Sequence, residues 1–299
     1  MSSTTHSCSP LQTLSCPLCQ QPLLLGGTCG PSSGAGSASP SWRCGSGHTF
    51  DVAKQGYVNL LPVQNKRSKD PGDSKAMVKA RAEFLRAGYY QPLAAKLAEV
   101  VLDQGGEPQT LLDAGCGEGY YLRELLAQAE QRQQQLICAA LDISKWAVQA
   151  AAKQAPRVTW LVASNNHIPL PTASLDTLLC VFGFPVAHEF RRVLKPNGRL
   201  IMVDPANHHL LELKQIIYPQ VHSKPEQLPV PADTWQLTDQ QRLTFTISLT
   251  QPEHIQQLLT MTPHLYRASS EGRARAAALT HIDVTVDVWI RTFTDTSNN

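Results

Sequence analysis

The sequence predicts an α/β protein in which a small N-terminal domain, rich in cysteine pairs, precedes a Rossmann-like, doubly wound parallel sheet. Two observations predict this fold class. From residue 106 onward, apolar strand-like runs alternate with helix-like patterns, an order typical of parallel sheets covered by helices. Before residue 50 there is no such alternation, and this part of the sequence contains closely spaced cysteine and histidine residues.

The composition is that of a globular chain. Its 299 residues are 42% hydrophobic and 17% charged, enough for one large domain and a small satellite. No stretch approaches the ~18 apolar residues of a membrane helix. The N-terminus has no basic segment followed by an apolar one. We therefore expect a cytoplasmic protein with no membrane partner, whose cysteines stay reduced.

The charge is unevenly distributed. Residues 1–100 contain ten Lys and Arg against five Asp and Glu, whereas the remaining 199 residues contain 16 against 19. A basic N-terminal third followed by a mildly acidic remainder favours a polyanionic partner. Ordinary solvated lysines explain an excess of this size equally well.

The first 50 residues contain two pairs of potential metal ligands. Cys16 and Cys19 are separated by two residues, Cys44 and His48 by three, and both spacings are typical of structural zinc sites. Four protein ligands leave no open position on the metal, so we expect a structural zinc ion. The alternative is a set of unconnected thiols in a small core.

The segment between the two pairs is long and of low complexity. It contains GGTCGPSSGAGSASPS, which predicts a flexible hairpin tip over 26–41 that lengthens the hairpin without preventing the site. Cys29 within it is a competing ligand, which we rank below Cys44. Residues 1–13, with Cys8, are predicted to be a disordered head.

Residues 111–126, LLDAGCGEGYYLRELL, join an apolar run to a helix-like pattern through alternating glycines. Gly115, Gly117 and Gly119 would let a ligand approach the backbone at a helix N-terminus. The third glycine comes one position earlier than in the dinucleotide fingerprint, which disfavours an NAD-dependent oxidoreductase. With Asp113 before the turn, the loop is similar to the S-adenosylmethionine loop of class I methyltransferases.

Polar side chains follow the next two predicted strands. Asp142 ends LICAALDIS, where a carboxylate can accept ribose hydroxyl groups, and Asn165 follows VTWLVAS, where the adenine is usually contacted. Asp142 alone is equally explained as a helix N-cap. The order and spacing of these features together predict a nucleoside-cofactor fold.

The rest of the chain completes the sheet. LDTLLCVFGF and GRLIMVDP predict the fourth and fifth strands, with the helix EFRRVLKPNG between them. Alternating segments at 243–249 and 281–293 predict an antiparallel pair at the end of the sheet. We divide the chain into a zinc-binding RNA-recognition domain (1–62), a basic loop and helical connector (63–105) and a methyltransferase domain (106–299).

Three features together resemble a known family. They are the Cys/His quartet, LDAGCGEGYY, and the segment 50–93 with NLLPVQ, DPGDS and ARAEFL. As a set they are similar to the RlmA-type 23S ribosomal RNA (guanine-N1-)-methyltransferases, most densely from Cys16 to Tyr218. Two features depart from the family pattern: the 16-residue Gly/Ser-rich insertion, and 180–190, CVFGFPVAHEF, which should form the target-base pocket.

The resemblance implies methyl transfer from S-adenosylmethionine to N1 of a guanine in a 23S ribosomal RNA hairpin, by a homodimer whose zinc domain grips the RNA. The implied cofactor contacts, joined to those of the loop itself, are Tyr90, Asp113, Gly115, Gly117, Glu118, Gly119, Tyr120, Asp142, Asn165 and His209. Core packing for Tyr90 and a position at a helix start for His209 are the alternatives.

The catalytic residue stays open. Guanine N1 carries a hydrogen at neutral pH, so the enzyme must accept this proton or stabilise the anion on O6. Asp204, after the fifth strand, and His188 are weak candidates.

Cationic side chains follow the predicted zinc domain. Lys66, Arg67 and Lys69 lie in a polar loop, and Lys79 and Arg81 on the helix after it, where they are candidate RNA-phosphate contacts. The alternative is a solvated face.

Two rival functions remain. One is a small-molecule S-adenosylmethionine-dependent methyltransferase with a zinc-knuckle lid. The other is an RNA-binding module with an inactive cofactor fold, against which the intact Asp113, glycine and Asp142 positions argue.

Overall fold

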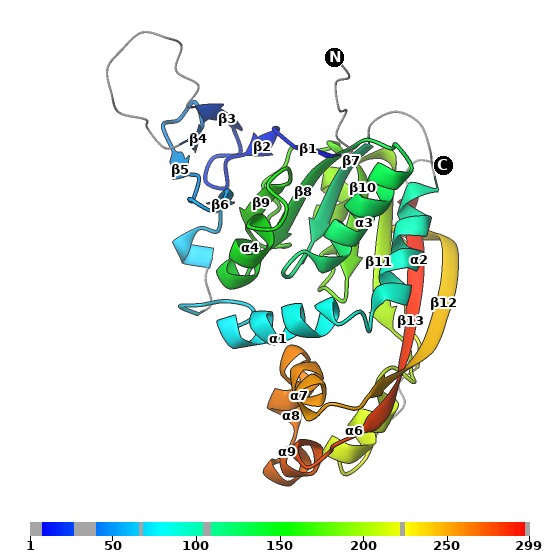
Figure 1. Ribbon diagram of the computed structural model, residues 1–299. Helices are drawn as coiled ribbons and strands as arrows, with labels where there is room; N and C mark the ends of the chain where they lie inside the picture. The colour runs from blue at the N-terminus through cyan, green and yellow to red at the C-terminus, as the bar shows by residue number, and fades with distance from the viewer. Residues whose placement is uncertain (1–7, 27–39, 66–67, 104–108, 222–224, 297–299) are drawn as a thin grey trace.

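The computed structural model describes residues 8–26, 40–65, 68–103, 109–221 and 225–296. Within them a nine-stranded sheet forms the main body and a smaller sheet lies at its side (Figure 1). The main-sheet strands are β1 (Cys8–Pro10), β6 (Tyr57–Asn59), β7 (Gln109–Ala114), β8 (Leu136–Asp142), β9 (Thr159–Val162), β10 (Leu175–Val181), β11 (Leu194–Pro205), β12 (Trp235–Leu249) and β13 (Ile282–Asp295).

The smaller sheet belongs to the N-terminal part of the chain. Its strands, paired in sequence order, are β2 (Leu14–Ser15), β3 (Pro22–Gly26), β4 (Ser41–Arg43) and β5 (Thr49–Asp51). The helices are α1 (Lys75–Arg86), α2 (Gln91–Leu102), α3 (Tyr120–Gln131), α4 (Lys145–Ala152), α5 (Ala187–Val193), α6 (Leu211–Ile217), α7 (Pro252–Met261), α8 (His264–Arg267) and α9 (Ser270–Ala277), with a 3₁₀ turn at Val63–Asn65.

The main sheet has the order β12-β13-β11-β10-β7-β8-β9-β6, with β1 beside β8. Strands β6 to β11 run parallel, while β13 is antiparallel to both β11 and β12. The chain leaves β7 toward β8 on one side and reaches β10 on the other. Such a reversal opens a crevice beyond the carboxyl ends of the strands, where ligands of doubly wound sheets bind.

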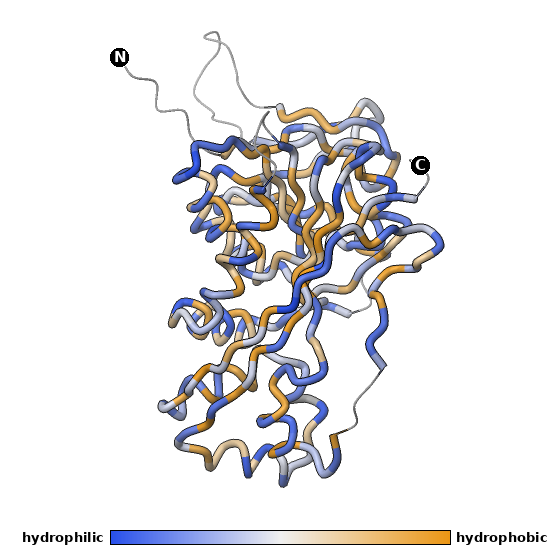
Figure 2. The backbone as a smooth tube through the Cα atoms, turned by 90° about the vertical axis from the view of Figure 1, so that its right-hand side faces the viewer, coloured by the Kyte–Doolittle hydropathy of each residue, from blue (hydrophilic) through white to orange (hydrophobic). Residues whose placement is uncertain are grey.

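Helices cover the sheet and its carboxyl-end edge. In Figure 1, α2, α3 and α4 lie in front of the sheet, α1 crosses below it, and α6 to α9 form a lobe under α1. Figure 2 shows hydrophobic segments running through the centre of the body, as expected for strands buried on both faces. Among the described residues, none of the helices is long and apolar enough to cross a bilayer.

The predicted alternation of strands and helices is confirmed, as is the antiparallel pair, β12 and β13, at the sheet's end. Its first strand begins at Trp235, well before the predicted residue 243. The hairpin tip 27–39 lies outside the described residues, but Gly26 and Ser41 at its ends pair with each other in β3 and β4.

Two parts of the predicted domain organisation are wrong. Residues 8–13 are not a disordered head, because β1 pairs with β8 and Leu11 is buried. Residues 57–59, assigned to the zinc domain, form β6 and extend the main sheet beside β9. In both cases a three-residue strand pairs with a strand far away in the sequence, and so short a segment carries no periodicity of its own.

Candidate functional site

The four predicted metal ligands converge on one point. The ligand atoms of Cys16, Cys19, Cys44 and His48 all lie within 4.8 Å of one another. Cys19 Sγ is 3.6 Å from Cys44 Sγ, and His48 Nδ1 is 3.4 Å from Cys44 Sγ and 3.5 Å from Cys16 Sγ. Tetrahedral zinc with bonds of about 2.0–2.3 Å places its ligand atoms about 3.4–3.8 Å apart. The quartet therefore fits zinc, and Cys29 lies outside the described residues.

Backbone hydrogen bonds shape both knuckles. The Cys16 amide donates to Gln21, and Gln20, with φ 63°, donates back to Cys16. In the second knuckle the Cys44 amide donates to His48, and Gly47, with φ 85°, donates to Cys44. Each pair of ligands is thus held at a tight turn.

The zinc ribbon is docked against the main domain. The Ser15 amide donates to Pro169 O at 2.9 Å, and the Gln20 and His167 side chains meet at 2.6 Å. Leu14, Leu23 and Trp42 belong to a buried cluster that also contains Leu161 of β9 and, from the segment after β9, Ile168 and Leu170. The ribbon therefore holds a fixed position beside the 164–170 segment.

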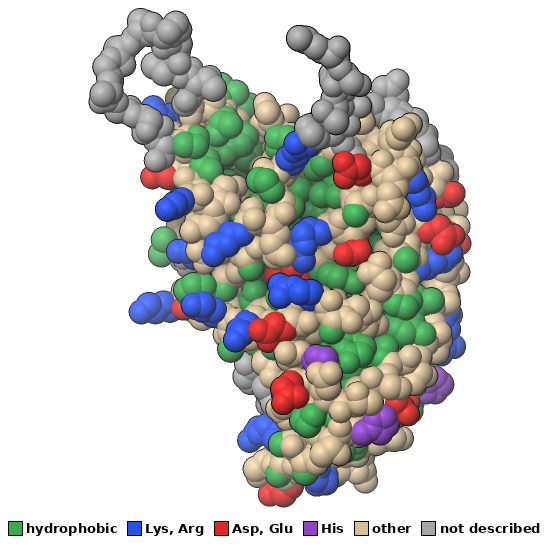
Figure 3. Space-filling view, in the orientation of Figure 1, with side chains coloured by type: hydrophobic (Ala, Val, Ile, Leu, Met, Phe, Trp, Pro, Cys, Tyr) green, Lys and Arg blue, Asp and Glu red, His purple; other side chains and the backbone are tan. Residues whose placement is uncertain are grey.

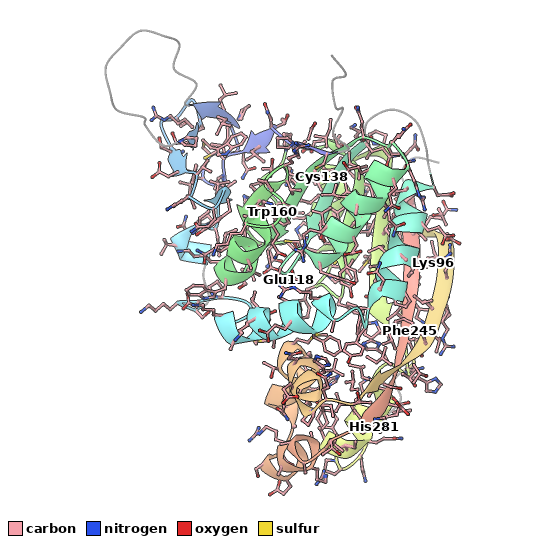
Figure 4. The ribbon with its side chains drawn as sticks, in the orientation of Figure 1. Lys96, Glu118, Cys138, Trp160, Phe245 and His281 are labelled. Carbon is pink, nitrogen blue, oxygen red and sulfur yellow. The ribbon has the colours of Figure 1, made fainter. Side chains whose placement is uncertain are left out.

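The glycine loop follows β7 at the crevice. Gly115, Gly117 and Gly119 all have positive φ, which favours glycine. A side chain on Gly119 would also meet Trp160, 2.7 Å from the Cβ position. Figure 4 places Glu118 at the lower edge of the sheet, directly above α1. Glycine is thus required at position 119 both by the backbone conformation and by the packing against Trp160.

Asp142, at the end of β8, fixes the loop from the next strand. One carboxylate oxygen accepts from the Gly117 amide at 3.0 Å and the other from the Ser144 amide at 2.7 Å. Burial raises the pKa of this carboxyl, and the two amides oppose that rise. Each oxygen keeps a second lone pair, so Asp142 can also accept ribose hydroxyl groups.

Asp113 and Glu118 leave buried oxygens without partners. Among the described residues, Asp113 Oδ1 and Glu118 Oε1 make no hydrogen bond, while Glu118 Oε2 pairs with Arg123 at 2.9 Å. Burial, together with the charges of Asp142 and Glu118, raises the pKa of Asp113 to about 7. An orphaned acidic group beside a glycine loop fits the cationic methionine part of S-adenosylmethionine.

An aromatic cluster closes the same crevice. Tyr90 is buried, and its ring contacts Phe182, His209 and Phe245 at centroid distances of 6.4–6.5 Å. Burial raises the pKa of Tyr90 and lowers that of His209 to about 3, so His209 is neutral. Its Nδ1 accepts from the Asp287 amide at 3.3 Å. The structure thus joins Tyr90 and His209, predicted from the resemblance alone, in one apolar wall.

The predicted Tyr120 and Asn165 lie on either side of this crevice. Tyr120, the first residue of α3, donates its hydroxyl to Gln91 at 3.1 Å. Asn165 donates to Phe184 O at 3.0 Å, and its buried Oδ1 has no partner in the described chain. The ordered loop 182–186 is therefore tied to the strand end that carries Asn165.

The two catalytic candidates lie at opposite ends of the sheet. Asp204 is near the end of β11, beside the crevice, and burial raises its pKa to about 6 despite Arg291, whose Nη1 lies 3.8 Å away. His188 is exposed at a cavity of about 860 Å³ at the opposite edge, lined among others by Lys195, Trp235 and Asp295. The site geometry therefore favours Asp204.

The predicted RNA contacts do not form one set. Lys66 and Arg67 lie outside the described residues, and Lys69 is exposed. The side chain of Lys79 is 75% exposed and 3.7 Å from Glu83, whereas that of Arg81 is 23% exposed and ion-paired with Asp73. Lys79 faces solvent, and Arg81 faces the cofactor loop.

Sequence reasoning missed the contact between the DPGDS segment and the cofactor site. Ser144 Oγ, which caps α4, donates to Asp73 O at 2.7 Å. Gly72 has φ 80°, and a Cβ there would lie 2.8 Å from Ile143 Cγ2, so only glycine fits. An Asp-Pro-Gly-Asp-Ser sequence signals a tight turn, but not what the turn packs against.

Fold and sites together define an S-adenosylmethionine-dependent methyltransferase with an N-terminal zinc ribbon. Residues 14–69 match the family model of the RlmA N-terminal zinc ribbon, and 111–198 match that of a methyltransferase domain. The 23S rRNA (guanine(748)-N(1))-methyltransferase of Streptomyces fradiae is 33% identical over 271 residues, 89% of this chain and 90% of that protein.

Two further relatives carry names for the same guanine-N1 activity on 23S rRNA. A protein of Micromonospora griseorubida is 38% identical over 68% of this chain and 69% of its own length. A protein of Bacillus subtilis strain 168 is 30% identical over 82% of this chain and 87% of its own length. The chain belongs to the RlmA family of 23S rRNA guanine-N1 methyltransferases.

We expect Cys44→Ser to abolish stoichiometric zinc binding and to lower the thermal midpoint, because three ligands hold structural zinc far less tightly than four. Metal analysis of the purified protein and a thermal melt measure both effects. The matched control is Cys29→Ser, which should keep one zinc per chain. A Cys44→Ser protein with full zinc content would contradict the assignment.

Proposed function

We propose that this chain binds S-adenosylmethionine in the crevice below β7, β8 and β10, and methylates N1 of a guanine presented by a 23S rRNA hairpin. The observation that carries the proposal is that two features lie at the same edge of the sheet. One is Asp113, whose buried Oδ1 has no hydrogen-bond partner in the described chain, and the other is the loop 182–184 with its exposed Phe182 and Phe184. The first suits a cationic cofactor and the second a base.

Each group makes a distinct contribution to the proposed complex. S-adenosylmethionine, when bound, supplies a methyl group activated by its sulfonium. Asp142 orients the ribose, Asp113 offsets cationic charge, and Tyr90 with His209 excludes water from the crevice. Positioning of the reacting nitrogen then supplies most of the acceleration, since displacement at such a methyl group needs little covalent help from protein.

Asp204 is the proposed acceptor for the guanine N1 proton. It lies beside the end of β10 and is only partly exposed, and its Oδ2 makes no hydrogen bond within the described residues. A carboxylate with a pKa of about 6 is ionised at neutral pH and still basic enough to take part in proton transfer.

We expect Asp204→Asn to lower kcat about 10²-fold or more, which is the usual contribution of a general base. In the unaltered enzyme the rate should rise with pH through about 6 as Asp204 ionises, and then level off. Steady-state rates on an RNA hairpin between pH 5 and 8 measure this. His188→Gln is the control and should keep both rate and profile; an unchanged rate in Asp204→Asn would exclude Asp204.

Phe184 is the proposed stacking surface for the base. It is 88% exposed, the largest exposed fraction among the large hydrophobic residues described, yet its carbonyl is held by Asn165. Gly183 before it has Cys180 Sγ 2.8 Å from its Cβ position, so the loop bends where a side chain would not fit. An exposed ring on a backbone held in place at this end of the sheet is suited to base stacking.

Replacing Phe184 by Leu should raise KM for the RNA about tenfold, since stacking on an aromatic ring contributes about 1–3 kcal/mol per base. Phe184→Trp should retain the KM of the unaltered enzyme, and calorimetry should show the same S-adenosylmethionine affinity in both variants. Val63→Ala, at another exposed apolar position, is the control. Equal KM values for the Leu and Trp variants would contradict stacking.

The proposed RNA backbone surface lies over α1 and α4. Figure 3 shows Lys and Arg side chains across this face, where Lys75, Lys79, Lys145 and Lys153 are exposed. Lys69 lies shortly before α1 in the chain, and Lys66 and Arg67 remain proposed contacts. Assembly as a homodimer is likewise a proposal, supported only by the family resemblance.

Mapping of methylated guanines tests the function directly. Mass spectrometry of 23S rRNA from cells with and without the gene should show one guanine-N1 methyl group that depends on the gene and on Asp142. Guanine 748, the position in the name of the Streptomyces relative, is the first to inspect. A rival small-molecule methyltransferase would leave the rRNA unchanged.

A further inference from the structure

The direction of Arg81 separates it from the other cations of the N-terminal half. It lies on α1, two residues after the exposed Lys79, and points toward the sheet. A Cβ on Gly117 would lie 3.7 Å from Arg81 Nη1 and 3.9 Å from its Cδ. The guanidinium therefore lies directly over the middle glycine of the cofactor loop.

Two segments from outside the sheet hold this guanidinium in place. Nη1 pairs with Asp73 in the turn before α1, and Nη2 donates to Met261 O at 3.0 Å, at the end of α7. The turn with Asp73 is itself fixed by Ser144. An arginine held in this way has already lost its rotamer freedom, so further hydrogen bonds cost little entropy.

Part of the guanidinium's binding capacity is unused. A guanidinium has five N–H donors, and the hydrogen bonds of Arg81 within the described residues occupy two of them. It lies near Asp142, whose pKa it lowers against the larger effect of burial. Arg123, another arginine at the loop, is engaged by Glu118. Arg81 thus brings a cation with donors to spare over the loop.

We propose that Arg81 binds the α-carboxylate of the methionine part of S-adenosylmethionine, and is a cofactor-site residue rather than an RNA-phosphate contact. This rests on the proposed use of that cofactor. The methionine part carries an ammonium, a sulfonium and a carboxylate. The acids Asp113, Glu118 and Asp142 suit its cationic groups but repel its carboxylate, so a site of this kind needs one anchored cation at the loop.

The partial burial of Arg81 also argues against a phosphate contact. Its side chain is only 23% exposed and lies over the glycine loop, where a large polyanion has little access. Lys79 on the opposite side of α1 is 75% exposed. The two residues, assigned alike from the sequence, therefore have different partners.

The experiment compares two ligands that differ only in the carboxylate. Calorimetry on the full chain measures Kd for S-adenosylmethionine and for its decarboxylated analogue. The unaltered protein should bind the analogue roughly 10- to 100-fold more weakly, the range expected for one charge-assisted pair. Arg81→Gln should weaken the binding of S-adenosylmethionine by a similar factor. It should leave the Kd of the analogue within about twofold of that for the unaltered protein, so that the variant no longer discriminates between the two ligands.

Two variants keep the test sharp. Arg81→Lys retains the charge and should keep part of the discrimination, even if Arg81→Gln proves too unstable to titrate. Lys79→Gln, on the same helix, should bind both ligands as the unaltered protein does. Equal weakening of both ligands in Arg81→Gln would overturn the proposal, because Arg81 would then only brace the loop. Unchanged binding of both would overturn it as well.

The outcomes are distinguishable from failure of the proposed function. If the unaltered protein bound neither ligand, the cofactor assignment itself would fall. If it bound S-adenosylmethionine with the expected discrimination but left 23S rRNA unmethylated, the Arg81 inference would stand and the RNA substrate would be wrong.

Discussion

The cofactor end of the molecule depends on the burial of three acidic groups: Asp113 near the end of β7, Glu118 in the loop after it, and Asp142 at the end of β8. Burying an ionised carboxylate costs several kcal/mol unless donors or cations offset it. Glu118 has Arg123, and Asp142 has two backbone amides. Asp113 has an oxygen without any partner in the described chain, and its pKa rises to about 7. Protonation of Asp113 or a cationic ligand beside it would offset this cost.

Elements outside the sheet complete this site. The turn before α1 contacts the start of α4 through Asp73 and Ser144. Helix α7 contacts α1 through Met261, and it contacts the turn after α1 through His254, whose Nδ1 is 2.8 Å from the Tyr89 hydroxyl. Helix α7 thus braces the helix that carries Arg81 against the glycine loop. This packing helps to hold α1 in place, because an isolated helix of 12 residues would be only marginally stable.

Local patterns made most of the site predictable. Polar ligand-binding residues lie at the carboxyl ends of the strands, and zinc ligands have a typical spacing in the sequence. The positions of Asp113, Asp142 and the Cys/His quartet could therefore be predicted from the sequence. The partner of a helix face does not follow from it. Residues two apart on a helix point in directions about 200° apart, so Lys79 and Arg81 must lie on different sides of α1. Which of the two faces the glycine loop depends on the turn with Asp73 and on α7, whose Met261 lies 180 residues after Arg81. The resemblance placed the target-base pocket at 180–190, but the exposure of Phe184 in this loop does not follow from the local sequence.

The zinc ribbon and the proposed base pocket are joined by a short chain of contacts. The ribbon touches the 164–170 segment through Ser15 and Gln20, and that segment begins with the turn carrying Asn165, which holds Phe184. Asp142 and the glycine loop do not lie on this path. The ribbon thus supports the loop that carries Phe184, whereas α1 and α7 support the glycine loop. In the proposed complex the zinc ribbon would therefore order the surface that receives the base, while the buried acids and Arg81 would order the methyl donor.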